Sequence, residues 1–153
     1  MTTSIKEVSL TTGWDLPQEQ VRARLVELEA QDREQEQVEI PCTEYFSDGC
    51  YGREVFIPKG TRLVGEIHLT EWITVVSRGH IQIVSEEGAS VVDARERPRT
   101  FISPAGVKRA GYALEDTWWT MFRATPLTTT EEIRAVHIAK DYSQLEDHKK
   151  WLG

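Results

Sequence analysis

The sequence predicts a mainly β fold in which one β domain is flanked by helices at both ends. The middle of the chain is a succession of short runs rich in β-branched and aromatic residues, each closed by turn residues. The two ends instead show apolar residues at helical spacing and helix-capping pairs. Many short strands separated by frequent turns are typical of a β-sandwich or barrel. With 153 residues, the chain is long enough to bury the core of a single domain.

An N-terminal helix is expected after residue 15. Asp15 can cap it and Pro17 suits its first turn. Val21, Leu25 and Leu28 then recur at helical spacing, with polar residues between them. This pattern predicts a helix packed on one side, and we assign residues 1–40 to an N-terminal helical arm.

The central region, residues 41–125, is assigned to the β domain. Its turns are marked by glycine and proline, as in Pro58-Lys59-Gly60 and Pro104-Ala105-Gly106. The expected strands span residues 51–57, 62–68, 72–77, 80–85, 90–94, 100–103, 108–113 and 117–124.

Residues 126–153 return to helical signals. Thr129 with Glu132, and Ser143 with Glu146, have the spacing of a capping box. We expect a C-terminal helical tail that packs on the barrel or on a partner subunit.

Composition limits the partners. The net charge of −7 argues against a nucleic acid or an anionic membrane as the main partner. A small anionic ligand is still compatible with it, because a local basic pocket can oppose the global field. Cys42 and Cys50 are expected to be reduced thiols, and no secretion signal or membrane-spanning run is recognised. A cytoplasmic location follows as the expectation.

The segment from Tyr51 to Thr125 resembles a cupin, a double-stranded β-helix or jelly-roll barrel. In the first cupin motif a glycine precedes an H-x-H pair, and a glutamate and a second glycine follow. Gly60 and Gly79 match the glycines. Glu66-Ile67-His68 occupies the H-x-H position and Trp72 the glutamate position.

The second cupin motif contains a P-x-G turn followed by a histidine and an asparagine. Pro104-Ala105-Gly106 matches the turn, whereas Arg109 and Ala113 stand at the histidine and asparagine positions. The resemblance therefore implies a single cupin-type jelly-roll barrel that keeps the glycine and proline positions but has a degenerate metal site.

The stretches GCYGREVFIPKGTRLVGEIH, VVSRGHIQIVSEEG and FISPAGVKRAGYALEDTWWTMF look like a group of small cupin-like proteins encoded by bacteriophages. That resemblance implies a viral protein acting in the host cytoplasm, where it could sequester a host nucleotide-derived signal. Because cupin-like barrels often pair through their sheets, it also implies a homodimer.

The expected site is a ligand pocket inside the barrel. Strand alternation would place Glu66, His68 and Trp72 on one face, which faces the interior of a cupin. Arg109 would pair with Glu66, because an unpaired buried carboxylate is costly. The expected ligand-binding residues are Glu66, His68, Arg109 and Arg53 as polar groups, with Trp72, Tyr112 and Trp118 as flat walls.

These residues favour a non-catalytic binder of an anionic or nucleotide-like metabolite, with no metal and no cofactor. Arginine beside an aromatic ring suits an anionic or planar ligand. Two alternatives remain open. One is a cupin enzyme of the isomerase, epimerase or dioxygenase type that uses His68 with or without a metal. The other is a structural or interaction scaffold, in which the tryptophans Trp72, Trp118 and Trp119 fill the core.

Overall fold

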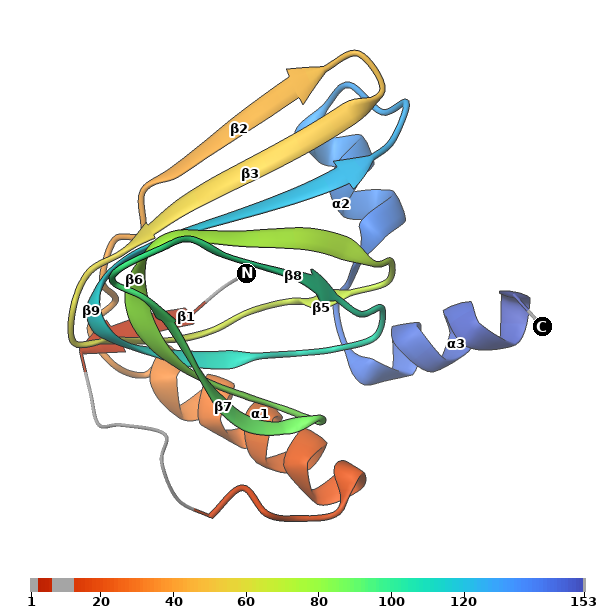
Figure 1. The fold of residues 1–153 in the computed structure, drawn as a ribbon. Helices are drawn as coiled ribbons and strands as arrows, with labels where there is room; N and C mark the ends of the chain where they lie inside the picture. Colours follow the sequence, from red (N-terminus) through yellow and green to blue (C-terminus); the bar gives the residue numbers. More distant parts are fainter. Residues whose placement is uncertain (1–2, 7–12, 153) are drawn as a thin grey trace.

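A computed structural model describes residues 3–6 and 13–152, with only the backbone of residues 3–6. It is mainly β with an antiparallel sheet and three helices, which confirms the predicted fold class (Figure 1). The strands are β1 (Thr3–Lys6), β2 (Cys42–Ser47), β3 (Cys50–Ile57), β4 (Thr61–Val64), β5 (Ile67–His68), β6 (Trp72–Ser85), β7 (Gly88–Ala94), β8 (Arg99–Ser103), β9 (Ala110–Ala124) and β10 (Ile138–Ala139). The helices are α1 (Gln18–Arg33), α2 (Thr130–His137) and α3 (Tyr142–Leu152).

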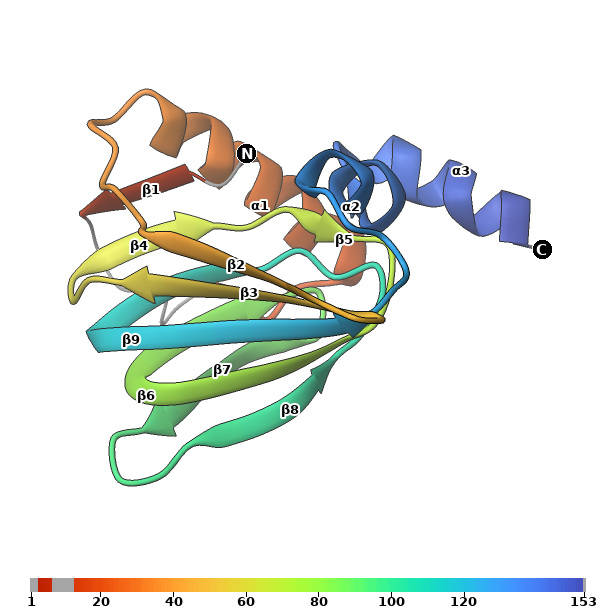
Figure 2. The ribbon, with the colours of Figure 1, turned by 90° about the horizontal axis from the view of Figure 1, so that it is seen from above.

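Two long strands, β6 and β9, organise the barrel. They pair with each other along most of their length. β9 then pairs with β3 through one half and with β4 through the other, while β6 pairs with β7 and β8. The sheet therefore curls around an interior that β3, β4, β6 and β9 line, as the view from above shows (Figure 2).

Each long strand replaces two strands that were predicted separately. In β6 the predicted interruption at Gly79 is an irregularity within one strand, where the register with β9 shifts. Gly79 has φ 131°, and a Cβ there would lie 2.6 Å from the Cα of Thr117. Glycine thus lets β6 bend against β9 without ending, which a turn-based prediction does not anticipate.

The predicted strand 62–68 is instead divided into β4 and β5. The Gly65 N–H donates to the Arg109 carbonyl oxygen at 2.8 Å, between the two strands. β4 pairs with β1 and β9, whereas β5 pairs only with β10 among the described residues. Regular alternation from Val64 to Trp72 is therefore lost, and Val64 packs toward α1 instead of the barrel interior.

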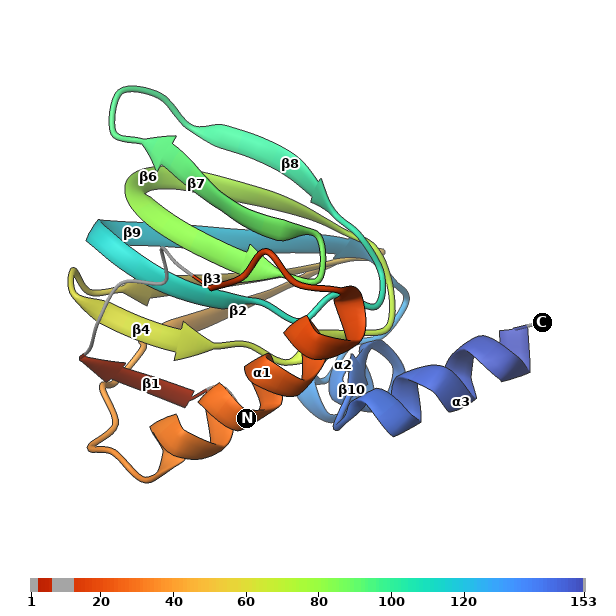
Figure 3. The ribbon, with the colours of Figure 1, turned by 90° about the horizontal axis from the view of Figure 1, so that it is seen from below.

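Helix α1 covers one side of the barrel, next to β1 and β4 (Figure 3). Val21 and Leu25 are fully buried against Val64 and Val84, as the helical spacing predicted. The expected cap is wrong: the helix begins after Pro17, and no side chain among the described residues caps it. Proline there still fits, because its fixed φ and missing N–H are tolerated at a helix start.

The tail contains two helices. Thr129 caps α2 by accepting from the Glu132 N–H, which confirms the first capping box. The second is wrong: Asp141, not Ser143, accepts from the Gln144 N–H at the start of α3. Ile133 of α2 and Leu145 of α3 are buried, so both helices dock on the barrel.

Cys42 and Cys50 are free thiols. None of the helices in the described part of the chain is long and apolar enough to cross a membrane.

Candidate functional site: a cavity inside the barrel

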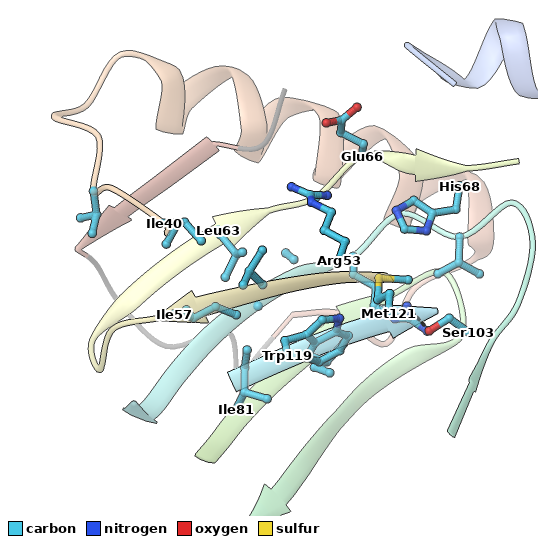
Figure 4. Close-up of a pocket in the computed structure, with 18 of the residues that line it drawn as sticks. Ile40, Arg53, Ile57, Leu63, Glu66, His68, Ile81, Ser103, Trp119 and Met121 are labelled. Carbon is cyan, nitrogen blue, oxygen red and sulfur yellow. Dashed lines mark hydrogen bonds between the residues drawn. The ribbon is translucent and has the colours of Figure 1, made fainter. Parts of the chain in front are cut away.

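The barrel encloses a cavity of about 490 Å³, within the size range of small-molecule sites. Its walls come mainly from β3, β4, β6 and β9, and β5, β8, α2 and the connectors α1–β2 and β8–β9 add further residues (Figure 4). The lining residues are mainly apolar, with a smaller group of charged and polar side chains: Gln37, Arg53, Glu66, His68, Ser103, Arg109 and Arg134.

Strand alternation explains which side chains line the cavity. On β3 the inward positions are Arg53, Val55 and Ile57. On β9 they include Trp119 and Met121, which pair with Val55 and Arg53 across the two strands. Residues between these positions point to the outer face.

Two arginines reach the cavity without a carboxylate partner. The Arg109 Nη1 donates to the Ser103 Oγ at 2.9 Å, and its guanidinium carbon lies 5.8 Å from the centroid of the Phe101 ring. The Arg53 Nε donates to the Cys42 sulfur at 3.3 Å. Within residues 13–152, neither guanidinium has a carboxylate oxygen within 4.0 Å. The cavity therefore carries positive charge that the surrounding side chains do not neutralise.

The predicted Glu66–Arg109 ion pair is wrong. Glu66 accepts hydrogen bonds from Arg134 of α2 instead, at 3.0 Å and 2.7 Å. Because the strand is interrupted between β4 and β5, Glu66 lies at the rim of the cavity, where its side chain faces Arg134 of the C-terminal tail. Burial alone would raise the pKa of Glu66, but the two hydrogen bonds from Arg134 help to bring it below its usual value.

His68 is partly buried on the cavity wall, and its imidazole is neutral near pH 7. Burial, together with the positive charges of Arg53 and Arg109, lowers the pKa of His68 from 6.5 to about 4. A neutral imidazole can both donate and accept one hydrogen bond, so His68 adds polarity to the cavity but no charge.

This pKa predicts that acid destabilises the protein through His68. As the pH falls below 6.5, the unfolded chain binds the proton while the folded chain excludes it until about pH 4. His68 alone then lowers the free energy of unfolding by up to about 1.4 kcal/mol per pH unit across that window.

Urea unfolding at pH 7 and pH 5 measures the loss of free energy of unfolding, which should be smaller in His68→Asn. A control, His148→Asn on α3, should keep the full loss. Equal pH dependence of His68→Asn and the parent would contradict the prediction.

Trp72 lies behind the cavity wall. It is 3% exposed and belongs to a buried cluster with Tyr51, Met121 and Ile133. Its ring centroid is 5.3 Å from that of His68, and it borders a second, smaller cavity of about 140 Å³. The Trp72 Nε1–H has no hydrogen-bond acceptor among the described residues. Trp72 thus supports His68 from behind and does not form a wall of the main cavity.

Tyr112 and Trp118, the other expected walls, lie away from the cavity. Tyr112 packs against the cluster that α1 forms with the barrel. Trp118 lies on the outer face, 41% exposed, with its ring centroid 4.8 Å from that of Phe56. Adjacent residues of a strand point to opposite faces, so Trp119 is the tryptophan that lines the cavity.

The sequence reasoning therefore missed several lining residues. Met121 could have been found from Trp119 by strand alternation. Ser103 directly precedes the P-x-G turn, and no motif marks its role. Arg134 gave no local signal, because it meets Glu66 only through the docking of α2.

The cavity offers few metal ligands. No group of three or more His, Cys, Asp or Glu side chains with the placement of a metal site occurs among the described residues. Glu66 and His68 occupy the metal-ligand positions of the cupin motif. Glu66 is paired with Arg134, and the imidazole of His68 lies in the positive field of Arg53 and Arg109, which disfavours a bound cation.

No family model and no curated protein matches the chain. Among solved structures it is similar to a cupin superfamily protein from Desulfitobacterium hafniense (11% identity, TM-score 0.47, 62% of this chain and 85% of that chain). It is also similar to a cupin domain from Bordetella pertussis (14%, TM-score 0.47, 60% and 98%) and to a cupin domain from Schizosaccharomyces pombe (16%, TM-score 0.44, 64% and 74%). These similarities concern the fold alone.

Proposed function

We propose that this protein binds a small anionic ligand in the barrel cavity and does not transform it. The observation that carries the proposal is the placement of Arg109 and Arg53 in a mainly apolar cavity with no carboxylate partner among the described residues. Burial lowers the pKa of Arg109, an effect that Glu87 and Glu86 oppose, but an arginine stays protonated. An anion would supply the missing counter-charge.

The surroundings strengthen this attraction. Charges interact more strongly in an apolar cavity than in water, and a guanidinium can hold a carboxylate or phosphate with two parallel hydrogen bonds. Among the described residues that line the cavity, Arg53, Arg109 and Arg134 outnumber the carboxylate of Glu66. The cavity thus opposes the net charge of −7 that the whole chain carries.

The state of His68 supports binding over catalysis. General acid–base catalysis is most efficient when the pKa of the catalytic group lies near the working pH. At a pKa of about 4, His68 is a weak base at neutral pH. No other histidine lines the cavity within the described residues.

Calorimetry with pairs of anionic and neutral compounds tests the proposal. Suitable pairs are AMP and adenosine, glucose 6-phosphate and glucose, and benzoate and benzamide, with a cyclic dinucleotide to represent the nucleotide signals that the phage resemblance implies. At least one anion should bind and raise the melting temperature, while its neutral partner should bind at least about tenfold more weakly. Binding of neutral partners as tightly as of anions would contradict the proposal, and so would the failure of every anion to bind.

A further inference from the structure

We infer that the ligand is an amphipathic anion, with one carboxylate or similar head and an apolar body. The inference rests on the proposed function and specifies the chemical class that the same cavity would take. It follows from the way charged and apolar side chains are distributed along the cavity.

The cavity changes character along its strands. Along β3 the inward side chains run from Arg53 through Val55 to Ile57, a distance of about 13 Å at the usual rise per residue. The close-up shows the same order: Arg53, Glu66 and His68 gather at one end, and Ile57 lies toward the other (Figure 4).

Neighbouring strands repeat this order. At the Arg53 end, Met121 of β9 and Ser103 of β8 line the wall, with Arg109 bonded to Ser103. At the Ile57 end the wall is made by side chains that carry no charge: Ile40, Val55, Leu63, Ile81, Ile83 and Trp119. One end can therefore hold an anionic group, and the other can bury apolar surface.

A hydrophilic metabolite would fit this cavity poorly. The hydroxyl groups of a sugar or the ring nitrogens of a base would be buried against isoleucine and leucine side chains, and each unpaired polar group would weaken binding. An alkyl chain or an unsubstituted aromatic ring has no such groups and gains from leaving water. The wall therefore discriminates against sugars and nucleotides and in favour of an apolar body.

The head group has partners of its own. Arg109 can hold a carboxylate through its guanidinium, and Arg53 adds a second positive charge nearby. The neutral imidazole of His68 can donate a hydrogen bond without adding charge. One carboxylate satisfies this set, because Glu66 already occupies Arg134.

Calorimetry on the full chain with acetate, butyrate, hexanoate, octanoate and decanoate tests the inference. Each added methylene should tighten binding by about fourfold until the apolar end is filled, after which the affinity should level off. Octanol, which has the same chain without the charge, should bind at least about tenfold more weakly than octanoate.

A near-isosteric variant probes the apolar end. Val55→Thr adds a hydroxyl at almost constant volume, and it should weaken octanoate binding by about tenfold while leaving acetate unaffected. Val91→Thr, at an exposed position of β7, is the matched control and should bind both compounds like the parent.

The outcomes separate the inference from the proposed function. If phosphate or AMP binds in an Arg109-dependent manner but affinity does not rise with chain length, the inference is overturned and the proposed function stands. Octanol binding as tightly as octanoate would also overturn the inference. If neither the anions that test the proposed function nor the carboxylates of this series bind, both the proposed function and the inference are overturned.

Discussion

Replacing Arg109 by methionine is expected to weaken the binding of any anion in the cavity by about 100-fold without destabilising the ligand-free protein. Hydrogen bonds to charged groups contribute about 1.5–3 kcal/mol each, and methionine can form none with the ligand. The ligand-free protein loses the hydrogen bond to Ser103 and the contact between the guanidinium and the Phe101 ring. In exchange, it no longer buries a cation that lacks a carboxylate partner among the described residues, and methionine fills much of the same volume.

Calorimetric titration and urea unfolding of Arg109→Met measure the two effects. Arg97→Met, in the exposed loop between β7 and β8, is the matched control and should change neither. A loss of more than about 2 kcal/mol in the free energy of unfolding of Arg109→Met would show that Arg109 is a structural residue. Unchanged anion affinity would show that the anion binds elsewhere.

Replacing Asp32 by alanine should lower the free energy of unfolding by about 3–5 kcal/mol. Asp32, near the end of α1, is fully buried, and its carboxylate accepts from Arg62 of β4 at 2.6 Å and 3.2 Å. Alanine would leave the guanidinium of Arg62 partly buried without this partner. The pair joins α1 to the strand that carries Leu63, so its loss should also loosen the apolar end of the cavity.

Chemical denaturation of Asp32→Ala provides the measurement. Asp15→Ala, at an exposed position, should stay within about 0.5 kcal/mol of the parent. The double variant Asp32→Ala with Arg62→Met should recover part of the loss, because it removes the unpaired charge as well. A loss below 1 kcal/mol in the single variant would mean that water screens the pair.

Much of the fold could be predicted from local patterns. The bounds of β3 and the buried face of α1 follow from alternation and helical spacing, which depend on neighbouring residues alone. The continuity of β6 through Gly79 could not, because it depends on how closely Thr117 of another strand approaches. A glycine that marks a turn and one that permits a bulge look the same in a sequence.

The site shows the same limit. Arg53, Glu66, His68 and Arg109 do line one cavity, but the partner of Glu66 comes from a helix far along the chain. The neighbouring tryptophans of β9 illustrate a second limit: alternation says that they face opposite ways, and only the register of β9 in the barrel says which one faces inward. The homodimer and the phage setting stay predictions.

The contact between Glu66 and Arg134 also gives the C-terminal tail an electrostatic role. Arg134 acts as a counter-ion that keeps the carboxylate of Glu66, at the cavity wall, from neutralising the arginines inside. Arg53 extends toward Glu66 in the close-up, and its positive charge also acts on that carboxylate (Figure 4). A chain shortened before α2 would therefore keep its inner arginines yet present a weaker positive potential, so residues beyond the barrel help to set the charge within it.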